Sequence, residues 1–150
     1  MIPFLPLLER VLLALWVGAL WTVGLVVVPL LFAELDRPTA GTVAGVLFRY
    51  LNHAGLVIGG FLLLRNRLAV AGHSVSALLL ASMLFLILIN EFVLAPQIMA
   101  LRETGFAAGS TEAARFGRLH GAASVVYLIN ALSGLALLVL DGRQSVRKNP

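Results

Sequence analysis

The length of the uncharged apolar segments constrains the fold most strongly. The chain carries no charged residue from Val11 to Phe32, and a helix needs about 20 apolar residues to cross a hydrocarbon core about 30 Å thick. The apolar part of a signal peptide has only about 7–15 residues, so this segment is expected to remain as a span. The 150 residues predict a single-domain, all-α integral membrane protein, a four-transmembrane-helix bundle with spans at about 7–32, 39–64, 71–101 and 111–140.

The composition fits a chain that is surrounded by lipid. Hydrophobic residues make up 60% of the sequence and charged residues 12%, whereas about a quarter of the residues of a soluble domain are charged. The net charge is +4, but the basic residues stand singly at predicted helix ends, where their side chains reach lipid headgroups. We therefore expect the chain to interact with the lipid bilayer, and we do not expect it to bind nucleic acid. The absence of cysteine excludes disulfides and thiolate metal sites.

Polar residues mark several helix ends. Asp36 precedes Pro38, which predicts an N-cap with proline in the first helical turn. Ser110 is a second expected N-cap, at the start of the fourth span. Asp141 and Gly142 are expected to stop that span, because glycine commonly follows the last helical residue.

The basic residues also predict an orientation. Six of them fall on the side of the termini and five on the other side. Under the positive-inside rule, both termini are expected in the cytoplasm, with His73 at the cytoplasmic interface. The six are Arg10, Arg65, Arg67, Arg143, Arg147 and Lys148, and the five are Arg37, Arg49, Arg102, Arg115 and Arg118.

A weak internal repeat relates the two halves of the chain. Pro29 and Pro96 lie near the ends of the first and third spans, and their separation (96 − 29 = 67) recurs between His53 and His120. The pattern indicates two pseudo-repeated helical hairpins related by an axis along the membrane normal. The two histidines would then be symmetry mates that face each other across the bundle at one depth.

Polar residues are expected to gather in the non-cytoplasmic half of the bundle. On the fourth span, a polar stripe runs from His120 to Gly134 with helical spacing, and a polar stripe in lipid should point inward. Such side chains often serve only as interhelical hydrogen-bonding groups. The residues that we expect to form a polar pocket are Trp21, Asn90, Glu91, Ser124, Tyr127 and Asn130.

Glu91 is the carboxylate among these residues, so placing it in the membrane costs the most free energy. A charged side chain at the centre of a membrane helix costs about 2.5–3.5 kcal/mol on insertion scales, so it should be paired, protonated or functional. A structural ion pair with Arg49, Arg115 or Arg118 is one interpretation, and simple exposure at the membrane interface is another. A metal ligand, a proton acceptor or a wall residue of a small-molecule pocket are the others.

His53 and His120 have two interpretations. Imidazole binds copper, zinc and haem iron, so two facing histidines could be cofactor ligands, or metal ligands together with Glu91. Alternatively, each histidine bonds only to a neighbouring helix. No HExxH or CxxCH spacing is present, and no nucleophile elbow or P-loop either. We therefore assign no catalytic residue.

Pairs of glycines four residues apart indicate close helix packing. Gly55 and Gly59 form one such pair, and Gly117 and Gly121 form another. Small residues with this spacing let helix backbones approach closely. They fit packing inside the bundle, a homo-oligomer, or docking on another membrane protein as an accessory subunit.

Three stretches carry a family resemblance. They are LALWVGALWTVGLVVVPLLFAELDRPTAGTVAGVLFR (13–49), NEFVLAPQIMALR (90–102) and FGRLHGAASVVYLIN (116–130). Together they cover nearly the whole chain, with a Trp-Gly pattern, a proline-centred helix end and a Leu-His-Gly opening. The sequence resembles a family of small four-span bacterial proteins of unknown function, whose domain is similar to that of eukaryotic transmembrane protein 205. This resemblance implies the bacterial inner membrane and no established activity.

The four-span layout is more distantly similar to two other families. These are the copper resistance protein D family and the HemJ-type protoporphyrinogen oxidases, which use membrane-embedded histidines and, in the second case, haem. The resemblance implies His53 and His120 as candidate ligands of haem or copper. The leading expectation is an inner-membrane protein of uncharacterised function with a polar pocket on the non-cytoplasmic side. A haem- or copper-binding redox or transport protein is the alternative.

Overall fold

The computed structural model describes residues 4–68 and 74–148 and contains no strand within them. Four of its helices are long and apolar enough to cross a membrane, namely Phe4–Glu34, Arg37–Leu68, Val75–Thr104 and Thr111–Gly142. The chain is thus a four-helix membrane bundle, as the hydropathy predicts. In order, the elements are α1 (Phe4–Thr22), η1 (Val23–Val27), α2 (Val28–Glu34), α3 (Arg37–Leu68), α4 (Ser74–Ile89), η2 (Asn90–Leu94), α5 (Ala95–Thr104) and α6 (Thr111–Lys148).

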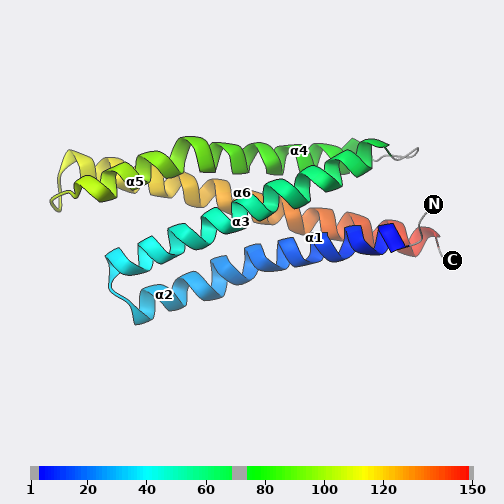
Figure 1. Ribbon diagram of the computed structural model, residues 1–150, viewed down its shortest axis with the longest axis horizontal. Coiled ribbons are helices and arrows are strands. Elements are labelled where there is room, and N and C mark those ends of the chain that lie inside the picture. The colour runs from blue at the N-terminus through cyan, green and yellow to red at the C-terminus, as the bar shows by residue number, and fades with distance from the viewer. Residues whose placement is uncertain (1–3, 69–73, 149–150) are drawn as a thin grey trace.

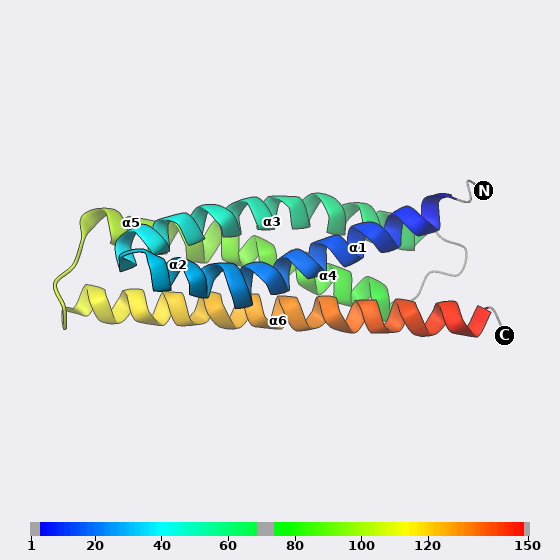
Figure 2. The ribbon, with the colours of Figure 1, turned by 90° about the horizontal axis from the view of Figure 1, so that it is seen from below.

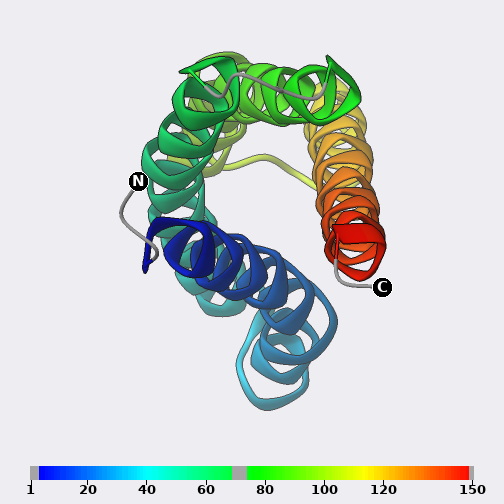
Figure 3. The ribbon, with the colours of Figure 1, turned by 90° about the vertical axis from the view of Figure 1, so that its right-hand side faces the viewer.

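The four helices run along one axis (Figures 1 and 2). The connections 35–36 and 105–110 lie at one end, which we call the loop end, and both ends of the chain lie at the other. Seen end-on, the helices follow the order α1, α3, α4, α6 (Figure 3), and α1 and α4 each pack against both α3 and α6. The bundle therefore consists of two hairpins, α1 to α3 and α4 to α6.

The core lies between α1 and α4 and repeats at the offset seen in the sequence. Leu13, Trp16 and Leu20 of α1 are buried, and so are Leu80, Met83 and Ile87, their counterparts on α4. Because these residues are spaced three or four apart, they fall on one face of each helix. The equivalent faces of the two hairpins meet in the same core.

Close packing of α3 against α1 requires the glycines that the sequence singles out. A Cβ atom on Gly55 would lie 2.8 Å from Trp16 Nε1, and one on Gly59 would lie 2.9 Å from Trp16 Cη2. This confirms the predicted packing role of this pair. Gly117 and Gly121 differ, because a Cβ on either would meet nothing within 4 Å.

Each hairpin contains one widened turn. The backbone N–H of Val28 donates to the carbonyl of Val23, and that of Ala95 donates to the carbonyl of Asn90, so both bonds span five residues. Proline lacks an N–H and its ring clashes with the carbonyl four residues earlier, and a π turn relieves this clash. Pro29 and Pro96 each stand two residues after the end of such a turn, so the backbone repeats at the same offset as the sequence.

The helix ends agree with the sequence at two places and differ at a third. The N–H of Thr39 donates to Asp36 Oδ2 at 3.1 Å, and that of Ala113 donates to Ser110 Oγ at 3.1 Å, which confirms both N-caps. The predicted stop at Asp141 and Gly142 is wrong, since α6 continues to Lys148.

Gly142 does not take the positive φ that ends a helix, whereas Gly105 (66°) and Gly109 (81°) in the loop do. Asp141 instead pairs with Arg10 Nε at 3.1 Å and joins α6 to α1. The predicted start of the third span at residue 71, and His73, lie outside the described residues.

Candidate functional site

A cavity of about 600 Å³ lies between the two hairpins at the loop end of the bundle. Figure 1 shows α2 and α3 separated there from α5 and α6. Cavities that hold small ligands typically have about 300–1,000 Å³. The wall is formed by Gly24, Val28 and Phe32 of the first span, by α3 from Gly41 to Asn52, by η2 and α5 from Asn90 to Glu103, and by His120, Ala123, Ser124 and Tyr127 of α6.

Tyr127 closes the inner end of this cavity. Its hydroxyl donates to the carbonyl of Leu20, and its ring packs edge-on against Phe48 with centroids 4.9 Å apart. A Cβ on Gly24 would lie 2.8 Å from Tyr127 Cε1, so the widened turn η1 accepts the ring only because this residue is glycine. Tyr127 thus joins the hairpins at the depth where the cavity begins.

Glu91 lies in the wall within a polar cluster from α3. Its Oε2 accepts a hydrogen bond from Asn52 Nδ2 at 3.0 Å, while Oε1 lies 3.8 Å from both Arg49 Nε and His53 Nε2. The Glu91 side chain is only 10% exposed. Paired groups of this kind are what a carboxylate in apolar surroundings requires.

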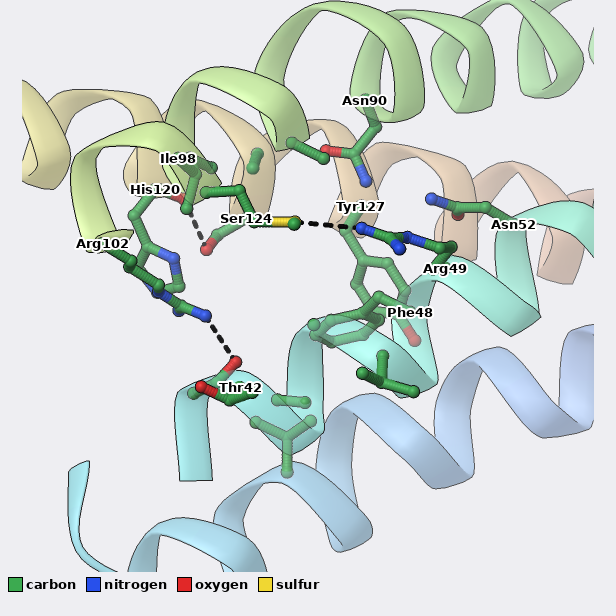
Figure 4. Close-up of a pocket in the computed structure, with 18 of the residues that line it drawn as sticks. Thr42, Phe48, Arg49, Asn52, Asn90, Ile98, Arg102, His120, Ser124 and Tyr127 are labelled. Atoms are coloured by element: carbon green, nitrogen blue, oxygen red, sulfur yellow. Dashed lines mark hydrogen bonds between the residues drawn. The ribbon is translucent and has the colours of Figure 1, made fainter. Parts of the chain in front are cut away.

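Of the three arginines that the sequence suggests as partners of Glu91, the structure pairs it with Arg49. Arg49 pairs with Glu91, and its Nη2 also donates to Met99 Sδ at 2.9 Å (Figure 4). Arg115 donates to Gln97 Oε1 at 3.2 Å instead. Asn52 was missed because an asparagine within an apolar helix gives no sequence signal of its partner.

Arg102 is the second residue that the sequence did not assign to the site. Its Nη1 donates to the carbonyl of Gly41 at 2.6 Å, and its guanidinium carbon lies 5.5 Å from the ring centre of Phe116. A Cβ on Gly41 would lie 2.9 Å from Arg102 Nη2. Figure 4 shows the guanidinium reaching from α5 to the start of α3.

Four of the six residues expected in a polar pocket lie in the cavity wall, and two do not. Asn90, Glu91, Ser124 and Tyr127 line it. Trp21 packs against the core, and its buried Nε1 has no partner in the described part of the chain. Asn130 is 3% exposed and also buried in the core, with Oδ1 unpartnered there.

The two histidines have different surroundings. His120 lies in the cavity wall and stacks on Phe116, with centroids 5.8 Å apart and planes 4° apart. His53 is absent from the wall, and its side chain is 56% exposed beside Glu91. The structure therefore does not bring both imidazoles into one cavity. Within residues 4–68 and 74–148, no group of three or more His, Cys, Asp or Glu side chains could hold a metal ion.

The cavity wall can bind the polar and the apolar end of one ligand at different places. Apolar side chains line much of the cavity, including Val28, Phe32, Ile98 and Met99, and charged groups stand only at defined points. A few polar groups in an apolar wall fix the orientation of a ligand, while the apolar area supplies most of the binding energy. A molecule with one polar and one apolar end fits this wall.

Comparison with known proteins places the chain in a family without naming an activity. Neither a curated protein nor a solved structure matches it. A family model does match, over residues 11–107, and its description is a domain of unknown function, DUF4149. The match spans most of the first hairpin and the whole of the third transmembrane helix, including Glu91 and Arg102. The chain belongs to the DUF4149 family.

Proposed function

We propose that this protein is a membrane-embedded binding protein that holds a small amphipathic molecule between its hairpins. The observation that carries the proposal is the cavity itself, whose largely apolar wall also contains the charged residues Glu91 and Arg102. In a bundle of this size, such side chains are costly unless they are paired or used. Glu91 has its partners within the protein, whereas the wall around Arg102 leaves room for a ligand.

The proposed orientation places the cavity on the non-cytoplasmic side of the bacterial inner membrane. Both ends of the chain lie opposite the cavity (Figure 1). The excess of basic residues near the termini, six against five, favours a cytoplasmic location for that end. The cavity would then be open to the outer leaflet and the adjoining aqueous phase.

Filling the cavity tests this function. Ser124 lines the cavity, and its hydroxyl is already bonded to the carbonyl of His120 on its own helix. Ser124→Phe should therefore place a ring in the cavity without breaking a contact between helices. Val125→Phe is the matched control, because Val125 is 56% exposed and lies outside the wall.

The readout is native mass spectrometry of the proteins released from nonionic detergent. The parent and Val125→Phe should retain the same bound amphiphile, and Ser124→Phe should lose most of it. Equal retention by Ser124→Phe would show that the bound molecule lies elsewhere, and its absence from every folded variant would overturn the proposal.

Haem or copper binding is the second proposed function. It is supported by the distant similarity to the copper resistance protein D and HemJ-type families and by the position of His120 in the wall. Ligation of one haem by both histidines does not fit, because His53 stands outside the wall next to Glu91. His120 is left as the single imidazole ligand from the cavity.

Absorption spectra separate this function from the leading one. A Soret band that shifts on reduction with dithionite, and that is lost in His120→Ala but kept in His53→Ala, would establish haem binding. Metal analysis of the same samples would show whether copper is bound. The leading proposal expects a featureless spectrum from folded protein.

A further inference from the structure

We propose that Arg102 forms an anion subsite at the mouth of the cavity, so that the bound amphiphile carries a phosphate or carboxylate head. This inference rests on the proposed function and names the chemical class of its ligand. Its basis is a guanidinium that the protein fixes in place without giving it a carboxylate partner.

Three contacts hold the guanidinium. Nη1 is bonded to the carbonyl of Gly41, the ring of Phe116 lies beneath the guanidinium, and Gly41 leaves the space into which Nη2 fits. An arginine has five N–H donors in a planar fork. Because only one donor of Arg102 has a partner, in the described part of the chain, the remaining donors are oriented and available for a ligand.

The acidic residues nearby do not neutralise Arg102. Glu91 is engaged by Asn52, Arg49 and His53. Glu103 also lines the cavity but is exposed, and neither carboxylate lies within 4.0 Å of the Arg102 guanidinium, among the described residues. An unneutralised guanidinium in a partly apolar wall favours an anion, and its fork matches phosphate and carboxylate in a bidentate manner.

The position of Arg102 fits the head of an amphiphile. Its partner Gly41 lies in the second turn of α3, near the loop end, whereas Tyr127 closes the inner end of the cavity. The apolar side chains of Val28, Phe32 and Ile98 contribute to the wall of the same cavity. A head at Arg102 and a chain directed toward Tyr127 would place the charge at the membrane interface and the chain in the hydrocarbon region.

Three probe molecules distinguish the contribution of the charged head to binding from that of the alkyl chain. We would measure binding of dodecyl phosphate, dodecanol and inorganic phosphate to the purified protein in nonionic detergent, by native mass spectrometry. The variants are Arg102→Gln, Arg102→Lys, and the control Arg118→Gln, which removes one positive charge from an exposed residue outside the wall. Thermal unfolding of each variant reports whether it is folded.

The parent should bind dodecyl phosphate at least about tenfold more tightly than dodecanol, as expected for a charge-assisted hydrogen bond. Arg102→Gln should remove this difference while leaving dodecanol binding within about twofold. Arg102→Lys should retain part of the difference, and Arg118→Gln all of it.

Other outcomes distinguish the two proposals. Equal binding of dodecyl phosphate and dodecanol by the parent would overturn the anion subsite and leave the cavity function intact. Inorganic phosphate that binds as tightly as dodecyl phosphate would assign the site to a free anion and overturn the lipid-like ligand. Failure of every probe to bind, with no effect of Ser124→Phe, would overturn the proposed function itself.

Discussion

Pro29 of the first hairpin and Pro96 of the second occupy the same position relative to a π turn, two residues after its end. Both turns contribute to the cavity, through Gly24 of η1 and through Asn90 and Glu91 of η2. A π turn carries one additional residue and changes the direction of the side chains that follow it. The cavity therefore lies where both hairpins depart from regular α-helix.

Replacing Gly24 with alanine should destabilise the bundle. The added methyl group would lie 2.8 Å from the Tyr127 ring, and such overpacking costs about 1–3 kcal/mol. Gly18→Ala is the control, because a Cβ there meets nothing within 4 Å, and alanine stabilises a helix by about 0.5–1 kcal/mol relative to glycine. Thermal unfolding in detergent should show a lower midpoint for Gly24→Ala only. Equal midpoints for the two variants would contradict the contact.

The hydrogen bond between Asn52 and Glu91 should contribute more than the charge of Glu91 alone. Asn52 is 5% exposed, and its removal in Asn52→Ala leaves the carboxylate without its amide donor, at a cost of about 1.5–3 kcal/mol. Glu91→Gln keeps an oxygen that can accept this bond and should cost less. The check is the free energy of unfolding of both variants. A larger loss in Glu91→Gln would instead make Arg49 and His53 the main partners of the carboxylate.

The sequence was sufficient for the features that depend on local chemistry. Hydropathy predicts the four helices, and Asp36 and Ser110 predict two caps that the structure confirms. The stop at Gly142 was wrong because glycine ends a helix only when the backbone takes a positive φ, and the composition does not determine this.

The candidate site was predicted only in part, because it depends on helix rotation. Asn90, Glu91, Ser124 and Tyr127 line one cavity, whereas Trp21 packs against the core and Asn130 is buried. The sequence predicts Arg102 only as an interfacial charge, since no residue near it in the chain indicates that Gly41 accepts its hydrogen bond. The only sequence signal for this contact between α5 and α3 is the glycine at position 41, which leaves room for a large side chain.

The N-cap at Asp36 should make the start of α3 sensitive to pH. Hydrogen bonds from Thr39 hold the pKa of the Asp36 carboxyl below its ordinary value of 3.8. Because the folded pKa is lowered, the cap contributes fully above about pH 3.8 and its contribution is lost as the pH falls further, through the folded pKa. The protection factors of the amides in the first turn of α3, which are exchange rates corrected for the intrinsic pH dependence, should therefore fall only in this acidic range.

Asp36→Asn provides the control for this effect. Asparagine is also a good N-cap and has no charge to titrate, so the variant should protect the turn at neutral pH and lose the acid sensitivity. A loss of protection with the same pH dependence in Asp36→Asn would show that another group titrates.

The glycine pair of α6 should be dispensable within one copy of the chain. A Cβ on Gly117 or Gly121 meets nothing, so leucine at both positions should leave the unfolding midpoint of the monomer nearly unchanged. Gly55→Leu should unfold the protein, because Gly55 packs on Trp16. If the surface of α6 is an interface with a second copy or another membrane protein, the Gly117 and Gly121 variant should lose that assembly in size-exclusion chromatography. If the variant assembles as the parent does, the surface around Gly117 and Gly121 is not the interface.

We propose that the cavity holds an amphiphile with its head at Arg102. A crystal structure of the protein grown in a lipid mesophase with a dodecyl phosphate brominated at the chain end tests it most directly. We expect phosphate oxygens about 2.7–2.9 Å from the Arg102 guanidinium nitrogens and an anomalous bromine peak near Tyr127. A cavity closed by packing of α2 against α6, or a bromine peak only on the outer surface of the bundle, would contradict it.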